Sequence, residues 1–202
     1  ASNREKNLKW LKKHQDSNVF IEDISESIGL LAVQGPKSRK LLKQLFDVDI
    51  NKLSFYHFQY GSIGGIRAMI SRTGYTGELG YEVFVKSKNL IELWRTILSK
   101  GIEFGIKPVG LGCRDTLRIE MRYHLYGLDI DENINPIEAG LSWVIKFGKE
   151  YFIGKNKLIN IRKNPNEKLV CIEMAERAIP RTGNSIIFNN KIIGKVTSGT
   201  MS

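Results

Sequence analysis

The sequence is poor in cysteine, histidine and proline. Its 202 residues include 2 cysteines, 3 histidines and 5 prolines. Cys113 and Cys171 lie far apart without a C-x-x-C spacing, and the histidines form no H-x-x-H or H-E-x-x-H pair. A disulfide scaffold and a metal site are therefore not expected. Signal-peptide features and an apolar run of about 18 residues are also missing, so we expect a soluble chain in a reducing compartment with no membrane segment.

Acidic residues are fewer than basic ones. Lys and Arg number 31, and Asp and Glu number 21, which gives a formal net charge of +10 at pH 7. This excess favours a negatively charged partner and leaves nucleic acid, an anionic ligand and an acidic protein open. Hydrophobic residues make up 42% and charged residues 26% of the chain, which excludes a disordered or collagen-like protein.

Hydrophobic periodicity predicts an α+β fold, in which an antiparallel sheet with covering helices is followed by the start of a small all-β domain. The patterns indicate helices over residues 3–13, 37–46, 90–99 and 111–123, and strands over residues 28–34, 54–60, 66–72, 80–86, 142–147, 169–174, 185–188 and 191–197. The helix side chains expected to be buried are Leu8, Trp10, Leu11, Leu41, Leu42, Leu45, Ile91, Trp94, Ile97 and Leu98.

Two glycine clusters resemble nucleotide-binding loops only superficially. The segments 61–65 (GSIGG) and 110–115 (GLGCRD) both depart from G-x-G-x-x-G and lack the surrounding βαβ unit. A hairpin turn and a helix entry explain them better, so we expect no dinucleotide site.

A glycine-rich segment at 71–83 (SRTGYTGELGYEV) is the first candidate for a binding site. Its glycines allow sharp turns and a close approach of the backbone to a flat ligand. Tyr75 and Tyr81 supply aromatic faces, and Glu82 stands at the start of a strand, where its carboxylate can point into a cleft. An exposed polar turn remains the alternative interpretation.

The second candidate is the segment 110–127 (GLGCRDTLRIEMRYHLYG). On a helix, Arg114 and Arg118 share a face, and Asp115 can pair with Arg118 at a spacing of three residues. For each of these charges the alternative is a solvated helix face.

Several segments together resemble one family, the aminomethyltransferase (T-protein) of the glycine cleavage system. They are SRTGYTGELGYEVFV (71–85), GLGCRDTLRIEMRYHLYGLDI (110–130), PIEAGLSWVIKF (136–147) and IPRTGN (179–184), with ASNREKNLKWL (1–11) and GKVTSGTMS (194–202) in support. The resemblance covers nearly the whole chain. It implies a fragment that lacks the N-terminal part and the end of the C-terminal domain. The implied domains are the tail of an N-terminal or insert subdomain (1–26), an α+β folate-binding domain (27–163) and the start of a C-terminal β-barrel (164–202).

The resemblance implies a reaction and its participants. Such enzymes transfer the methylene of the aminomethyl-lipoyl group of the H-protein to tetrahydrofolate and release ammonia. Tetrahydrofolate is then a co-substrate, no metal is needed, and the lipoylated H-protein is the partner. The resemblance also leads us to expect a monomer, located in the cytoplasm of a bacterium or in the mitochondrial matrix of a eukaryote.

The resemblance also assigns folate-binding residues. Glu82 would hold the pterin ring through a charge-assisted pair of hydrogen bonds. Arg114 would keep Glu82 ionised and orient the ligand. Tyr75 and Tyr123 would line the ligand, with Tyr56 or Phe55 as a further wall. The catalytic acid/base aspartate is expected upstream of Ala1, and Asp115 is expected to be a structural partner of an arginine.

Other functions remain open. Within the superfamily these are another folate-dependent demethylase and the folate domain of a sarcosine or dimethylglycine dehydrogenase, whereas the KGCYTGQE-like segment of iron–sulfur-assembly relatives is absent. A basic nucleic-acid-binding module is the alternative of another class. The basic residues are scattered and the aromatic residues form no stacking strip in the sequence, so nucleic acid is not the expected partner.

Overall fold

The computed structural model describes residues 2–200 and divides the chain into two compact units. Unit 1 comprises Ala1–Gly74 and Glu78–Pro108, and unit 2 comprises Tyr75–Gly77 and Val109–Ser202. Ala1, Met201 and Ser202 lie outside the described residues, as do the parts of the predicted end segments that include them. Within the described part, no helix is both long enough and apolar enough to cross a membrane. The predicted domain boundaries at 26 and 163 stay predictions.

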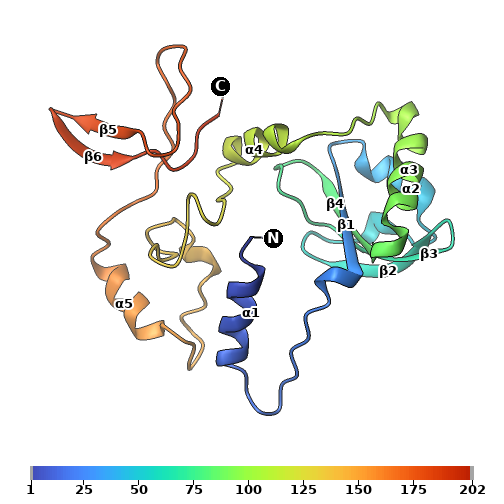
Figure 1. The fold of residues 1–202 in the computed structure, drawn as a ribbon, viewed down its shortest axis with the longest axis horizontal. Coiled ribbons are helices and arrows are strands. Elements are labelled where there is room, and N and C mark those ends of the chain that lie inside the picture. The colour runs from blue at the N-terminus through green and yellow to red at the C-terminus, as the bar shows by residue number, and fades with distance from the viewer. Residues whose placement is uncertain (1, 201–202) are drawn as a thin grey trace. The chain divides into compact units, whose positions relative to one another are not determined.

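Unit 1 is built on a four-stranded antiparallel sheet with the strand order β1-β4-β3-β2 (Figure 1). The strands are β1 (Ile28–Gln34), β2 (Phe58–Ile63), β3 (Ile66–Ser71) and β4 (Gly80–Lys86). The predicted strands at 28–34 and 80–86 are confirmed, and so is the hairpin of β2 and β3. Its turn residues Gly64 and Gly65 have φ values of 56° and 85°, which glycine adopts without strain.

Strand β2 begins later than the prediction of residue 54. Tyr56 has a φ of 63° and therefore interrupts the extended backbone. The Tyr56 N–H donates to the Arg72 carbonyl at 3.1 Å, and the Arg72 N–H donates to the His57 carbonyl at 2.9 Å. These bonds join the turn to the end of β3 before regular pairing starts at Phe58.

Helices α2 (Ser38–Leu45) and α3 (Leu90–Gly101) pack on the sheet and form the core of unit 1 (Figure 1). Alternation along β4 directs Tyr81, Val83 and Val85 into this core. The expected burial is confirmed for three helix residues, which are Leu41, Leu42 and Ile97.

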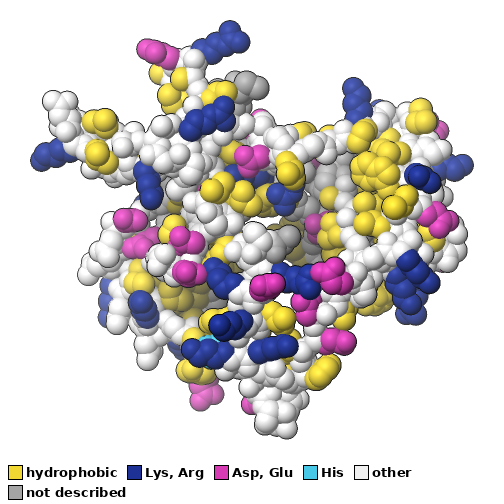
Figure 2. Space-filling model, viewed as in Figure 1, with side chains coloured by type: hydrophobic (Ala, Val, Ile, Leu, Met, Phe, Trp, Pro, Cys, Tyr) yellow, Lys and Arg dark blue, Asp and Glu magenta, His cyan; other side chains and the backbone are white. Residues whose placement is uncertain are grey.

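The predicted inward face of α3 is partly wrong. Ile91 is 66% exposed and Trp94 is 43% exposed, whereas Leu93 is fully buried. The helix carries two apolar stripes, and the one that contains Leu93 and Ile97 faces the sheet. On the other stripe Ile91 and Trp94 are exposed to solvent, and Figure 2 shows hydrophobic side chains gathered over α3.

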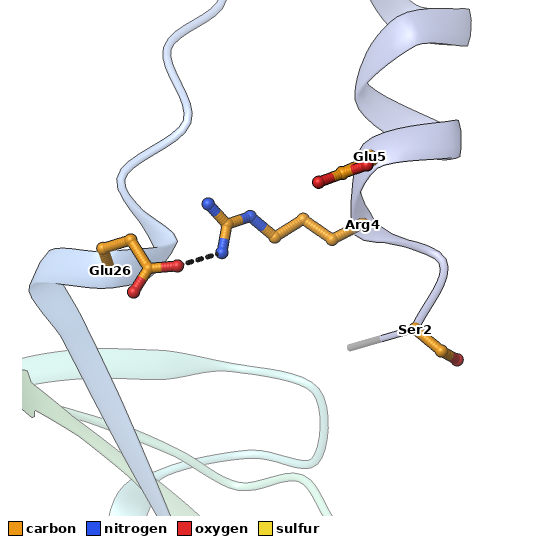
Figure 3. A pocket seen from close by; sticks show the side chains of 4 residues that line it. All are labelled: Ser2, Arg4, Glu5 and Glu26. Atoms are coloured by element: carbon orange, nitrogen blue, oxygen red, sulfur yellow. Dashed lines mark hydrogen bonds and ion pairs between the residues drawn. The ribbon is translucent and has the colours of Figure 1, made fainter.

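Helix α1 (Arg4–Lys13) buries no residue. The expected burial of Trp10 and Leu11 is wrong, since these side chains are 50% and 46% exposed. Arg4 joins the helix to the segment before β1 through Asp23 at 2.8 Å and Glu26 at 2.5 Å. Figure 3 shows the Arg4–Glu26 ion pair at a pocket whose lining residues are all polar: Ser2, Arg4, Glu5 and Glu26.

Unit 2 contains helices α4 (Leu111–Glu120) and α5 (Lys155–Lys163) and a two-stranded sheet of β5 (Ser185–Phe188) and β6 (Lys191–Lys195). The predicted hairpin is confirmed: Asn189 and Asn190 have φ values of 48° and 58°, as its two-residue turn requires. Helix α5 was not predicted. The β-barrel beyond this hairpin stays a prediction.

Two predicted strands do not form in unit 2. Residues 142–147 instead contain a short helical turn, Ser142–Val144, in which local bonds from the Val144 and Ile145 N–H groups use the backbone groups that a strand would offer. Residues 169–174 have no strand partner among the described residues, and the Leu169 N–H donates to the Glu138 carbonyl at 2.9 Å. A strand needs a neighbouring strand to satisfy its backbone hydrogen bonds. A hydrophobic sequence pattern does not show whether such a neighbour exists.

Candidate functional site

The predicted site residues form two groups, one in each unit. Glu82 belongs to unit 1, whereas Tyr75, Arg114 and Tyr123 belong to unit 2. The glycine-rich segment belongs to both units: Tyr75–Gly77 is part of unit 2, and the residues on either side of it are part of unit 1. Each group is described by itself.

Glu82 lies on β4 on the sheet face opposite the helices. Its register partners are Ala32 on β1 and Ser71 on β3. The side chain is half-buried. Thr73 Oγ1 donates a hydrogen bond to Glu82 Oε2, and within residues 2–200 Glu82 Oε1 accepts none. One carboxylate oxygen is therefore fixed by the protein and the other is available to a ligand.

A second hydroxyl supports this bond. Ser71 Oγ lies 3.0 Å from Thr73 Oγ1. A hydroxyl has a single hydrogen, and that of Thr73 goes to the carboxylate, so the Ser71 hydroxyl donates to Thr73. The chain of hydroxyls ends on Glu82 and orients it from one side.

Contacts within the protein explain why glycine stands at two positions beside this site. A Cβ atom on Gly74 or on Gly80 would overlap the side-chain amide of Gln34. We expected these glycines to admit a ligand to the backbone. At these two positions the space is filled by Gln34 instead, and sequence reasoning missed this residue because its contacts lie about 40 to 47 residues away along the chain.

The unit 2 group is an aromatic pair covered by a guanidinium. The Tyr75 and Tyr123 rings are stacked, with their centroids 5.6 Å apart and an angle of 23° between their planes. The Arg114 guanidinium lies 4.5 Å from the centroid of the Tyr75 ring, a cation–π distance. The structure thus brings together three of the four predicted residues. Burial raises the pKa of the Tyr75 phenol although Arg118 and Arg114 oppose the rise, and its hydroxyl donates to the His124 carbonyl.

The end of α4 places Tyr123 in this pair. The Arg122 N–H donates to the Ile119 carbonyl at 2.9 Å and the Tyr123 N–H to the Arg118 carbonyl at 2.7 Å, the two bonds of a Schellman cap. Arg122 holds the left-handed position of the cap with a φ of 58°, where glycine is usual. The helix therefore reverses sharply and Tyr123 follows directly after the reversal.

Arg118 organises the interior behind these side chains. It is 2% exposed, so the solvated-face interpretation is wrong for this residue. Its Nε lies 2.7 Å from Asp115 Oδ1, its Nη1 lies 2.5 Å from Asp129 Oδ2, and its Nη1 also donates to the Tyr123 carbonyl at 3.1 Å. The expected structural role of Asp115 is confirmed. Spacing in the sequence pointed to Asp115, but nothing pointed to Asp129.

The charges in this cluster stabilise one another. Burial alone would raise the pKa of Asp129, but hydrogen bonds from Thr197, the Leu125 N–H, Ser198 and Arg118 outweigh it, and the pKa of Asp129 lies below its usual range. Burial alone would likewise lower the pKa of Arg118, but Asp115 and Asp129 raise it. Both groups are therefore charged at neutral pH, and Asp129 is a poor candidate for an acid/base catalyst.

The described residues contain no group of three or more side chains able to hold a metal ion. Cys113 and Cys171 are free and exposed, so the chain has no disulfide. Of the further residues expected near folate, Phe55 and Tyr56 lie in unit 1 with ring centroids 4.1 Å apart, and both are more than half exposed.

Comparison with known proteins gives consistent matches. The model of the GCVT N-terminal domain matches residues 1–149. A protein of Halothermothrix orenii named aminomethyltransferase is 45% identical over 203 residues, which cover 100% of this chain and 57% of that protein. A Bacillus subtilis protein of the same name is 45% identical over 205 residues and is covered to 57%. The chain thus spans a little over half the length of these curated relatives.

A solved structure supports the fold. The crystal structure of glycine cleavage system aminomethyltransferase T from Bartonella henselae superposes with a TM-score of 0.62 at 22% identity, over 88% of this chain and 73% of that one. With the antiparallel sheet and its helices, this likeness confirms the predicted α+β class.

Proposed function

Because the chain belongs to the GCVT family, we propose that it is a tetrahydrofolate-binding portion of an aminomethyltransferase of the glycine cleavage system. The names of the relatives at 45% identity support this activity. The observation that carries the proposal is the Glu82 carboxylate, with one oxygen held by Thr73 and the other without a protein donor in the described residues.

The proposed reaction takes the methylene of the aminomethyl-lipoyl group on an H-protein and transfers it to tetrahydrofolate, with release of ammonia. The net charge of +10 suits an acidic protein partner, whose association it would accelerate. The bacterial origin of the named relatives favours the cytoplasm as its location.

Glu82 is proposed to bind the pterin. A carboxylate accepts hydrogen bonds only, and the pterin offers a 2-amino group and an N3–H side by side. The pair would be charge-assisted, as in bidentate recognition elsewhere. Held by Thr73 at Oε2, the Glu82 side chain loses little further rotational freedom when the ligand binds.

On the family resemblance, Arg114, Tyr75 and Tyr123 of unit 2 are also proposed to be folate-binding residues. The Arg114 guanidinium is exposed and donates no hydrogen bond to a described residue, so its donors are available to an anionic or carbonyl group. Asp115 and Asp129 are both bound to Arg118, and we assign neither of them an acid/base role.

Calorimetric titration with 5-formyltetrahydrofolate, a stable reduced folate, tests the proposal. Glu82→Ala should weaken binding by about 1.5–3 kcal/mol, roughly 10- to 150-fold, with the fold intact. Glu103→Ala is the matched control, because Glu103 is an exposed glutamate of the same unit. Equal affinity of the wild-type chain and Glu82→Ala would remove Glu82 from the site.

The alternatives are less well supported. Figure 2 shows Lys and Arg side chains interspersed with Asp and Glu side chains. A nucleic-acid module would bind with a steep salt dependence and without folate affinity. A folate domain of a dehydrogenase or another demethylase is disfavoured by the name that the relatives share.

A further inference from the structure

Gln34 ends β1 and has no part in the function proposed above. Its side chain lies on the same sheet face as Glu82, because Gln34 pairs with Gly80 and Ala32 pairs with Glu82 in the same register. Gln34 Nε2 donates to the Thr73 carbonyl at 3.3 Å and to the Tyr81 carbonyl at 3.0 Å. The amide thus joins the two ends of the glycine-rich loop.

The Gln34 amide fills the space beside two glycines. Gly74 follows Thr73 and Gly80 precedes Tyr81, and a Cβ at either glycine would overlap the Gln34 amide. The two carbonyls that receive its hydrogens belong to the neighbours of these glycines. The amide is therefore enclosed between two glycines and bonded beyond each of them.

Both ends of the loop that Gln34 holds lead to Glu82. Thr73 provides the hydroxyl that binds Glu82 Oε2, and Tyr81 is the residue before Glu82 on β4. If the Thr73 backbone moved, its hydroxyl would leave the carboxylate, because Thr has a single short side-chain torsion and cannot follow. The position of the Gln34 amide therefore determines whether Glu82 Oε2 keeps its donor.

We propose that Gln34 is a positioning residue for the pterin-binding carboxylate and acts on the ligand through Thr73 and Glu82. The test of this proposal by folate binding rests on the function proposed above. Gln34 touches no ligand in this scheme. It holds Thr73 so that one Glu82 oxygen is occupied and the carboxylate is fixed in a single orientation.

A double-mutant cycle tests this role by calorimetry with 5-formyltetrahydrofolate. Gln34→Met keeps the length of the side chain and removes both donors, and it should weaken binding about tenfold. In the Glu82→Ala background the same change should have no further effect, because the residue through which it acts is gone. Loss of binding by the same factor in both backgrounds would show a general structural role and overturn the proposal.

A second readout does not require folate. The chemical shift of the Glu82 carboxyl carbon, measured by NMR, should change in both Gln34→Met and Thr73→Val. Thr73→Val removes the hydroxyl that donates to Glu82 Oε2, and Gln34→Met displaces that hydroxyl by releasing the Thr73 backbone. An unchanged shift in a folded Gln34→Met protein would overturn the proposal. A changed shift in a chain that binds no folate would sustain the positioning role while the proposed function fails.

A matched control and a fallback complete the design. Gln59→Met replaces another glutamine of unit 1, whose buried Nε2 has no hydrogen-bond partner among residues 2–200, and should leave both readouts unchanged. If Gln34→Met fails to fold, the folate affinities of Thr73→Val and Gln34→Glu test the proposal instead. Glutamate has the same shape as glutamine, but when ionised it cannot donate to the two carbonyls. Wild-type affinity in both variants would overturn the proposal.

Discussion

The two units are stabilised in different ways. The core of unit 1 consists of fourteen buried apolar side chains from the sheet, α2, α3 and the segments between them. Among the described residues of unit 2 only four are buried, namely Arg118, Asp129, Ala139 and Val196. One unit is therefore organised around hydrocarbon and the other around an ion pair.

This difference has a physical consequence. Burial of apolar surface stabilises a fold without fixing directions, whereas a buried ion pair stabilises only when its geometry and hydrogen bonds are complete. Arg118 and Asp129 satisfy that condition through bonds to Tyr123, Leu125, Thr197 and Ser198. Unit 2 thus depends on a few specific contacts that connect α4 with the segment after β6.

The largest expected effect comes from removing the charge at the centre of unit 2. Arg118→Ala leaves Asp129 buried without its ion partner and should cost about 3–5 kcal/mol. Hydrogen exchange read by mass spectrometry should show the loss in residues 109–200 and leave the strands of unit 1 protected. Equal deprotection of both units would contradict the contrast between them.

Matched variants sharpen this prediction. Leu42→Ala creates a cavity in the core of unit 1. It should lower hydrogen-exchange protection in the sheet and helices of that unit and leave unit 2 unchanged. Combining Arg118→Met with Asp129→Leu should recover part of the loss of Arg118→Ala, because the unpaired charge is then absent. A double variant no better than Arg118→Ala would show that charge burial is not the cause.

Acid should produce the next effect in size. The pKa of Asp129 is lowered in the folded state, so its contribution is complete above the ordinary carboxyl pKa of about 3.9 and is lost as the pH falls below that value. Each unit of lowering corresponds to about 1.4 kcal/mol. The free energy of urea unfolding, followed in residues 109–200 between neutral pH and about pH 3, should fall more steeply with decreasing pH for the wild type than for Asp129→Asn. Equal slopes would exclude Asp129 as the source.

The smallest expected effect concerns backbone strain in unit 2. Arg122→Gly places glycine at the left-handed position of the α4 cap and should stabilise unit 2 by about 0.5–1 kcal/mol, after the entropy cost of glycine is subtracted. Urea denaturation measures the gain, and Lys12→Gly in the exposed helix α1 should instead show a loss. Destabilisation by Arg122→Gly would mean that the arginine side chain makes a contact worth more than the strain.

Local patterns predicted unit 1 better than unit 2. Strands β1, β3 and β4 alternate on a buried face and end at turn residues, so their positions follow from short stretches of sequence. The buried face of α3 could not be predicted from its own sequence, because the helix carries two apolar stripes. Packing against the sheet decides which of the two is buried. In unit 2, residues 142–147 and 169–174 have the composition of strands, but the described part of the chain offers them no neighbouring strand.

The candidate site divides in the same manner. Tyr75, Arg114 and Tyr123 were assigned to folate binding on the resemblance, and the structure groups their side chains. The contact of these three residues and of Glu82 with a ligand stays a prediction. Gln34 was missed, and for Arg118 only the pairing with Asp115 was predicted, because the other partners lie on segments distant in the sequence and a single sequence does not show which segments meet.

The Gln34 amide and its two glycines also link three positions in evolution. A methyl group at 74 or 80 would overlap the Gln34 amide, so alanine there would displace the amide from the Thr73 and Tyr81 carbonyls. A shorter side chain at 34 would remove that overlap, so substitutions at the three positions should covary across descendants of this sequence. A change at one of positions 34, 74 and 80 is therefore expected to alter which residues are favoured at the other two.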